Sequence, residues 1–414
     1  MTLKHGALNC LTNGSRSSFH RTFERLPVYV RDEQGCVGSA VARSGGSAAR
    51  RAGLSRRILR PPPHSSHRRA TRAHPPWALL HWIPSNASLP EATRGLWYRD
   101  SQTFGIEFEL APKHGEIPSE DSAEWLRVAK AIADALKHRL PTGSFGAVHA
   151  EYVGSERSAK SPAHWNVEYD DTTGWEVTTR VLAGVEGFCE VDAACRALAQ
   201  VAAEEDLCVD ARTGTHVHFG WSGDIQQLKR TVELVKLFEP ALGSLVAPSR
   251  IARLTGDGYD IDAPNPYSRP VSTVLSTDAL RDLRLFSDLT RLTSGDDDLR
   301  YVTFNVRPLD YQQTVEVRLH HGTLEPHKIL RWVSLWQQIL WAAEHPRREL
   351  EPTPDVQVIT PNADLIALAR EYLVPIEQPG QREFLALLQQ DRRDILERRW
   401  KPHAELAPWV QASR

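Results

Sequence analysis

A short segment of the chain, Phe104–Leu110, alternates apolar residues with two carboxylates, Glu107 and Glu109. Successive side chains of a β-strand point to opposite faces, so both carboxylates lie on one face, roughly 6–7 Å apart. Two carboxylates at this spacing raise each other's pKa unless a cation lies between them. Hard divalent cations such as Mg²⁺ prefer oxygen ligands of this kind. The segment therefore predicts a strand with a metal-binding face.

Four later segments show the same alternation of apolar residues with groups that bind metal ions or phosphate. Each predicts a strand with one apolar face for a helix layer and one charged or polar face. The polar residues are Glu176 in Trp175–Val181, His216 and His218 in Thr215–Trp221, Asn305 in Thr303–Arg307, and Glu316 and Arg318 in Thr314–His320.

Each of these signals taken alone has an ordinary structural interpretation. Polar residues that alternate along a strand usually mark a solvated sheet face. A single His-x-His pair or an in-strand Glu–Arg pair is also common at a surface. However, solvated faces typically carry Lys, Ser, Thr and Gln, whereas these five segments carry mainly Glu, His, Arg and Asn and contain no Lys. The joint pattern favours one shared site.

The elements between these strands indicate the fold class. Apolar residues at helical spacing predict helices over residues 120–140, 191–204, 225–247 and 326–344. Two further short strands are predicted over residues 148–153 and 165–169. The helices do not form a regular βαβ series, and neither GxGxxG nor GxxxxGK[ST] occurs. We expect an α+β fold with a mixed or antiparallel sheet rather than a doubly wound fold.

The first hundred residues differ in composition from the rest of the 414-residue chain. They hold 16 Lys and Arg against 5 Asp and Glu, whereas the remainder holds 34 against 47, and the formal net charge is −2. We expect residues 1–95 to be a basic, disordered extension. It has three competing interpretations: a solvated tail or a stretch upstream of the true start, an arm for nucleic acid or an anionic surface, or a transit peptide.

Composition also limits which binding partners and which cellular compartment we expect. No run of about 18 apolar residues occurs, and the start of the chain lacks the apolar stretch of a secretory signal. The five cysteines have no CxxC spacing, which argues against a disulfide framework or a Cys-based zinc site. We expect a cytoplasmic protein without a membrane partner, and the acidic body argues against nucleic acid as its main partner.

The order of these motifs resembles that of the amidoligase family, a branch of the carboxylate–amine ligases related to glutamine synthetase and the glutamate–cysteine ligases. The resemblance covers roughly residues 100–345. It implies a glutamine synthetase-like fold, in which a curved, mostly antiparallel sheet has helices packed on its outer face. We expect a catalytic domain over residues 96–345 and a C-terminal helical segment over 346–414. The motifs are FGIEFEL, WEVTTRVL, GTHVHFG, PSR and TVEVRLHHGTL.

The resemblance also implies roles for individual residues. Two or three Mg²⁺ or Mn²⁺ ions would be held by Glu107, Glu109, Glu176, His216 and Glu316. Arg318 would contact the transferred phosphoryl group, and Arg318, Glu316 and Glu176 would be catalytic. His218, Arg250 and Asn305 would contact nucleotide or substrate. A further carboxylate often accompanies such clusters, and here the candidates are Asp170, Asp171 and Glu186.

The implied activity is ATP-dependent amide-bond formation through an acyl phosphate, with release of ADP and phosphate. The substrates would be a small-molecule or peptide carboxylate and an amine, whose identity the sequence leaves open, as it does the oligomeric state. The acidic segment Gly256–Asp262 is a candidate flap that carries the general base. Two alternatives remain: a metal-dependent hydrolase that uses the His-x-His and carboxylate cluster, and a non-catalytic nucleotide-binding protein.

Overall fold

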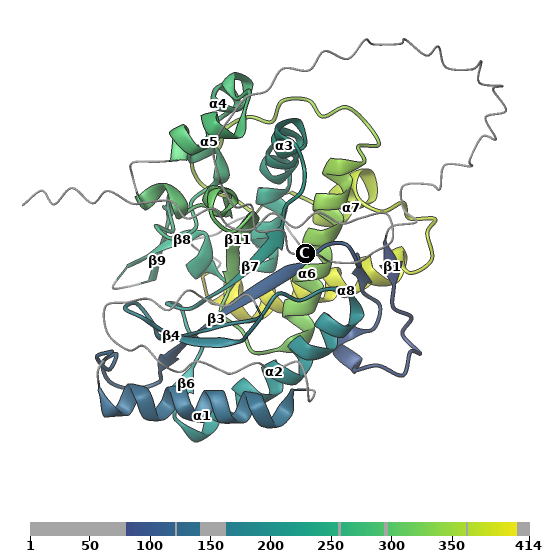
Figure 1. Cartoon of the computed structure of the whole chain (residues 1–414). Helices are drawn as coiled ribbons and strands as arrows, with labels where there is room; N and C mark the ends of the chain where they lie inside the picture. Colours follow the sequence, from purple (N-terminus) through teal and green to yellow (C-terminus); the bar gives the residue numbers. More distant parts are fainter. Residues whose placement is uncertain are drawn as a thin grey trace, which may run out of the picture. The chain divides into compact units, whose positions relative to one another are not determined.

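The computed structural model describes residues 80–120, 122–140, 163–255, 258–293, 297–361 and 363–403 (Figure 1). All of them belong to one compact unit, Arg72–Arg414. Most of the predicted extension over residues 1–95 and the predicted strand over 148–153 lie outside the described residues. Among the described residues, no helix is both long and apolar enough to cross a membrane.

A seven-stranded sheet forms the centre of this unit, and each of its strand pairs is antiparallel. Its order is β10-β11-β7-β3-β5-β4, and the short β6 pairs with the end of β3. The predicted α+β fold class with a largely antiparallel sheet is therefore confirmed. The strands are β3 (Phe104–Pro112), β4 (Asn166–Asp170), β5 (Gly174–Thr178), β6 (Leu207–Cys208), β7 (Gly214–Gly220), β10 (Phe304–Asn305) and β11 (Thr314–His321).

The remaining strands form two small antiparallel pairs. One pair joins β1 (His81–Trp82) to β2 (Trp97–Tyr98), within and just after the predicted extension. The other joins β8 (Ala252–Thr255) to β9 (Gly258–Pro264), so most of the predicted flap segment belongs to a hairpin. The three-domain division predicted from the sequence stays a prediction, although β1 shows that regular structure begins before residue 96.

Helices cover the apolar face of the sheet (Figure 1). Their starts follow local signals: Ser122 and Asp224 accept backbone N–H groups at the first turns of α1 and α3, and Pro326 opens α6. The α-helices are α1 (Ala123–Arg139), α2 (Gly184–Glu204), α3 (Ile225–Leu242), α4 (Thr277–Asp282), α5 (Phe286–Thr293), α6 (Pro326–Glu344), α7 (Leu365–Tyr372) and α8 (Gln381–Ile395).

Short 3₁₀ turns and one π-helical turn connect these elements. One of them, over Gly243–Leu245, follows α3 directly, so the helix expected to reach residue 247 ends at Leu242. Likewise, the strand expected over Thr303–Arg307 is reduced to the two residues of β10, because a 3₁₀ turn begins at Arg307. The turns are η2 (Glu91–Thr93), η3 (Gly243–Leu245), η4 (Pro248–Arg250), η5 (Val271–Thr273), η6 (Asp297–Arg300), η7 (Arg307–Asp310), η8 (Leu396–Trp400, the π-helical turn) and η9 (Lys401–His403).

Aromatic contacts fix the helices against the apolar face. Phe104 of β3 packs edge-on against Phe188 of α2, and Phe304 of β10 stacks on Trp336 of α6 at 5.8 Å between ring centroids. The indole N–H of Trp125 in α1 donates to the backbone carbonyl of Gly174 at the start of β5, at 2.8 Å. Large aromatic side chains contribute much of the burial energy in such a core. The opposite face of the same strands is thereby left for polar side chains.

Candidate active site

The register of the sheet places the predicted polar residues on one face. Glu107 of β3 lies opposite His216 of β7, and Glu316 of β11 lies opposite His218. On the outer side, Asn305 of β10 lies opposite Glu316. Because side chains directly opposite each other in an antiparallel pair have Cβ atoms about 4.5–5.5 Å apart, these residues are neighbours. Motifs far apart in the sequence thus meet in the middle of the sheet.

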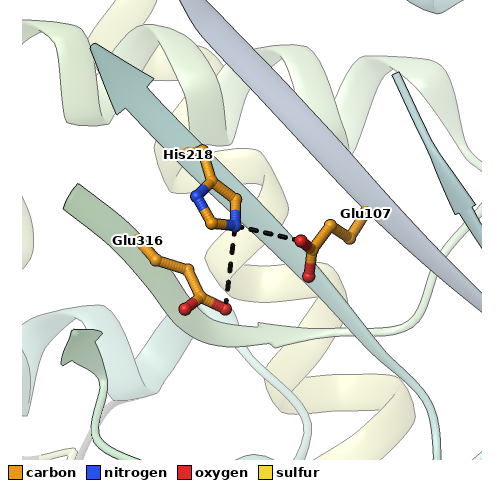
Figure 2. Close-up of side chains that lie close together, drawn as sticks. All are labelled: Glu107, His218 and Glu316. Carbon is orange, nitrogen blue, oxygen red and sulfur yellow. Dashed lines mark hydrogen bonds and ion pairs between the residues drawn. The ribbon is translucent and has the colours of Figure 1, made fainter. Parts of the chain in front are cut away.

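Three of these side chains form the tightest group, Glu107, His218 and Glu316 (Figure 2). One ligand atom from each lies within 4.8 Å of the others. The Nε2 atom of His218 is 3.0 Å from Oε1 of Glu107 and 3.9 Å from Oε1 of Glu316. On the other side of the ring, Nδ1 is 3.1 Å from the hydroxyl oxygen of Thr314. We call Glu107, His218 and Glu316 the central cluster.

His216 lies beside this cluster and faces a carboxylate with each ring nitrogen. Its Nδ1 atom is 3.1 Å from Oε2 of Glu107, and its Nε2 atom is 3.3 Å from Oε1 of Glu109. A neutral imidazole has one N–H and one lone pair, so it can donate to only one of them. The second contact is attractive only if the ring is protonated or a cation bridges it to the carboxylate. Such an arrangement fits a metal ion between imidazole and carboxylate.

Arg318 and Asn305 hold Glu316 in place. The guanidinium of Arg318 pairs with Oε1 of Glu316, and the amide of Asn305 donates to Oε2 at 2.7 Å. Burial by itself would raise the pKa of Glu316, but Arg318 and His218 outweigh it and hold the pKa below its usual value. Burial acts on Arg318 in the opposite sense, yet Glu316 and Glu107 raise its pKa. Both groups therefore carry their charges inside the protein.

Arg250, the predicted substrate or phosphate contact in η4, is almost fully buried at 2% exposure. Its guanidinium donates to the backbone carbonyl of Arg318 at 2.7 Å, and its Nε atom has no partner among the described residues. Burial lowers its pKa to about 10, which still leaves it charged at neutral pH. Gly214 makes room for it, because a Cβ there would lie 3.2 Å from the Arg250 guanidinium carbon.

Glu176 lies outside the central cluster, one strand further along the sheet. Its register partners are Glu109 on β3 and Glu168 on β4, so three carboxylates stand in one row. Like charges directly opposite each other destabilise a sheet, but the ligand atoms of this row do not converge as closely as those of the central cluster among the described residues. Glu168 was not among the residues selected from the sequence, although its alternation with Asn166 was a usable signal.

The three carboxylates considered as further ligands are placed elsewhere. Asp170 accepts hydrogen bonds from the backbone N–H groups of Thr172 and Thr173 and so closes the β4–β5 turn. Asp171 is exposed in the same turn, and Glu186 is exposed in the first turn of α2. Glu168 is therefore the better candidate for this position.

An aromatic contact near Arg318 is not predicted by the sequence. The Arg318 guanidinium lies 5.4 Å from the centre of the Tyr301 ring, which packs edge-on against Tyr267. Arg318 Nε also donates weakly to the backbone carbonyl of Tyr267, at 3.4 Å. Arginine stacked on an aromatic face loses little freedom when it binds a ligand. No spacing signal in the sequence connects Tyr301 to Arg318, because the contact depends on the packing of separate loops.

The donor set fits a hard or borderline divalent cation. Carboxylate oxygens dominate, and each nearby imidazole adds one nitrogen, a combination that suits Mg²⁺ or Mn²⁺ more than a thiolate-seeking metal. Glu107, His218 and Glu316 converge closely enough for shared coordination. His216, which the resemblance names as a ligand in place of His218, lies just outside that group, and its role stays a prediction.

An antiparallel α+β sheet whose polar face joins carboxylates, histidines and buried arginines suits an enzyme of charged substrates. The chain belongs to the amidoligase family: the family described as "Putative amidoligase enzyme" matches residues 100–340. This membership places the chain among the carboxylate–amine ligases. No curated protein matches it.

Two solved structures resemble the chain with low TM-scores and low sequence identity. One is described as a novel glutamine synthase homolog, with a TM-score of 0.36 and 17% sequence identity over 74% of this chain and 70% of that chain. The other is the complex between the prokaryotic ubiquitin-like protein Pup and its ligase PafA, with a TM-score of 0.36 and 13% identity over 75% of this chain and 67% of that chain. The family assignment rests on the match over residues 100–340.

Proposed function

We propose that the chain is an ATP-dependent carboxylate–amine ligase that works through an acyl phosphate. The observation that carries the proposal is the central cluster, in which three strands bring ligand atoms of Glu107, His218 and Glu316 within 4.8 Å of one another, with Arg318 paired to Glu316. Family membership supplies the reaction class. The cluster supplies the charges that transfer of a phosphoryl group requires.

The reaction needs activation because a carboxylate is a poor electrophile. A carboxylate oxygen of the substrate attacks the γ-phosphorus of ATP, and the bond to ADP breaks. The amine nitrogen then attacks the acyl carbon, inorganic phosphate leaves, and the nitrogen loses a proton. A bound Mg²⁺ or Mn²⁺ would neutralise the negative charge of the phosphate groups.

The chain's own residues position these groups. Glu107, Glu109, Glu176, His216 and Glu316 form the proposed metal-binding face, with Glu168 added from the structure. Arg318 would contact the equatorial oxygens of the transferred phosphoryl group, because its planar guanidinium can donate two parallel hydrogen bonds. Asn305 keeps Glu316 oriented by donating to its second oxygen. His218 and Arg250 would contact nucleotide or substrate.

Glu316→Gln tests this proposal with little change in shape. We expect it to abolish ADP formation when ATP, Mg²⁺ and a panel of amino acids and dipeptides are supplied, because a neutral amide cannot hold a cation beside Arg318. Glu124→Gln, an exposed position in the first turn of α1, is the matched control and should behave as wild type. Circular dichroism would establish that both variants fold.

A second readout does not depend on knowing the substrates. A non-hydrolysable ATP analogue with Mn²⁺ should raise the Tm of wild type and of Glu124→Gln, but not that of Glu316→Gln. Equal ADP formation by wild type and Glu316→Gln would contradict the proposal. Product formed without nucleotide would indicate a hydrolase instead.

A further inference from the structure

A cavity of about 180 Å³ lies beyond the Gly214 end of β7, away from the central cluster. This volume far exceeds the roughly 10–15 Å³ that one water molecule needs. The cavity lies between the end of β11, η4, the β9 strand and the C-terminal turns η8 and η9. Residues that line it include Ser249, Tyr259, His321, Arg398, Arg399 and His403. We call it the C-terminal cavity.

The charges around the C-terminal cavity are not balanced. Arg398 and Arg399 line it as exposed side chains, and neither has a carboxylate within 4 Å among the described residues. The carboxylate that lines it, Asp210, is already engaged by the guanidinium of Arg212 at 2.7 and 3.0 Å. Arg399 lines the same cavity as His321 and Tyr259, and its charge lowers the pKa of both. An anion would find two cations here without displacing any partner.

His321 adds a neutral donor to the wall of the cavity. It is 4% exposed, and its Nδ1 atom accepts the backbone N–H of Ala247 at 3.4 Å. Burial, together with His320, Lys328, Arg399 and Arg250, holds its pKa well below the usual value, so the ring is neutral. A neutral ring that accepts at Nδ1 carries its proton on Nε2. Among the described residues no hydrogen-bond acceptor is placed at that Nε2–H.

The C-terminal cavity and the central cluster are linked by short connections. Ser249 lines the cavity and precedes Arg250, which contacts the backbone of Arg318. The cavity is also lined by His321, which ends the β11 strand that carries Glu316, and by Gly322 directly after it. The wall formed by Arg398, Arg399 and His403 lies outside the family match over residues 100–340.

We propose that the C-terminal cavity binds an anionic group, a carboxylate or a phosphate, on the ligase substrate, whose other end carries the carboxylate that is activated at the central cluster. The inference rests on the proposed function and names its substrate class: a molecule that carries a second anionic group, such as an acidic amino acid, an acidic peptide or a phosphate ester. Arg399 is the main cationic contact, and His321 and Tyr259 are the neutral ones.

The hydroxyl group and the aromatic ring of Tyr259, which lines the C-terminal cavity, support this assignment. The Tyr259 hydroxyl lies beside Ser249, and burial raises its pKa, so it stays a donor. Its ring packs edge-on against His403 at 5.0 Å between centroids. The C-terminal cavity therefore combines the neutral hydrogen-bond donors Tyr259 and His321 with the positive charge of Arg399.

The test measures anion binding to the full chain directly, by calorimetry at low ionic strength, with inorganic phosphate and succinate as probes. We expect one site whose affinity falls at least tenfold in Arg399→Gln, equivalent to about 1.4 kcal/mol. Arg399→Lys keeps the charge and should lose less. Arg393→Gln, an exposed arginine of α8 outside the cavity, is the matched control and should bind as wild type.

The outcomes separate this inference from the proposed function. Glu316→Gln should keep the anion site that Arg399→Gln weakens, although it loses ADP formation. Tighter succinate binding assigns the cavity to a carboxylate, and tighter phosphate binding assigns it to a phosphate ester. The inference is overturned if neither probe binds, or if wild type and Arg399→Gln bind both probes equally, whatever ADP formation shows.

Discussion

Glu316 on β11 and Glu239 on α3 are both buried carboxylates, at 4% and 0% exposure, yet their surroundings differ. Glu316 has Arg318 and His218 beside it, and both lower its pKa. Glu239 accepts hydrogen bonds from the hydroxyl of Thr303 and from the N–H of Val271, at 2.8 Å for the latter. Its second oxygen has no partner among the described residues.

The two sites show that burial by itself does not decide the charge of a carboxylate. Burial raises the pKa of Glu239 to about 7, because two neutral donors and the more distant Lys236 offset it only in part. Lys236 is itself paired with Asp355 at 2.9 Å. The polar face keeps Glu316 charged by placing Arg318 and His218 against it, as a site for metal and phosphate requires. Glu239 instead supports the packing of α3 against the loop before β10.

The largest expected effect comes from removing the cation that distinguishes Glu316. Arg318→Ala should lower kcat for ADP formation on the order of 10³-fold, since a phosphoryl-contacting arginine contributes at least that much. It should also cost about 3 kcal/mol of unfolding free energy, because Glu316 is left as an unpaired buried charge. Steady-state kinetics and urea unfolding measure the two effects.

Arg318→Lys sharpens the same comparison because it keeps a positive charge near Glu316. We expect it to recover most of the stability but little of the activity, since an ammonium cannot reproduce the planar guanidinium. Arg382→Ala, an exposed arginine of α8, is the control. Full activity in Arg318→Lys would show that Arg318 acts only as a structural counter-charge.

The second effect concerns pH and the Glu239 site. The pKa of Glu239 is about 7 in the folded protein and near 4.5 in the unfolded chain, so both states are protonated below pH 4.5. Between pH 4.5 and 7 the carboxyl group ionises in the unfolded chain but stays largely protonated in the folded protein, so folding has lost about 3 kcal/mol once the pH is above 7. Glu239→Gln should remove this loss and be more stable than wild type at pH 8, as measured by urea unfolding.

Glu116→Gln, at an exposed position after β3, is the control for that measurement and should not change the difference in stability between pH 5 and pH 8. If Glu239→Gln leaves the pH dependence of wild type intact, Glu239 is charged in the folded protein. The contrast between the two buried carboxylates would then disappear.

The smallest expected effect is steric and concerns the space beside the polar face. A Cβ on Gly214 would lie 2.9 Å from Nε2 of His216 and 3.2 Å from the Arg250 guanidinium carbon. Gly214→Ala should therefore cost about 1–2 kcal/mol of unfolding free energy through overpacking of buried charged groups. Thermal and urea unfolding provide the measurement.

Gly105→Ala is the matched control because Gly105, on β3, lies on the same polar face of the sheet as Gly214. A Cβ there would meet only Thr179, at an ordinary 3.5 Å, so we expect no loss of stability. Equal losses in the two variants would mean that the cost lies in the strand backbone and not in the space that Arg250 occupies.

Much of the polar face was predictable from the sequence because strand geometry is local. In β3, β7 and β11, the alternation of apolar and charged residues shows that Glu107, His218 and Glu316 point away from the helices, and the register confirms that they meet. The same argument failed where strands were short: of the strand expected over Thr303–Arg307, only Phe304 and Asn305 pair with β11, and a 3₁₀ turn begins at Arg307. Sequence pattern does not reveal how far a strand continues once loop packing competes with it.

What the sequence by itself determined is which residues share a face, since the two-residue period of a strand is set by covalent geometry. Only the tertiary structure decided which faces meet. The strand order brings Glu168 next to Glu176, the loops bring Tyr301 over Arg318, and the C-terminal turns bring Arg399 to His321. These contacts join residues far apart in the chain, and their energy depends on packing and burial, which no local pattern specifies.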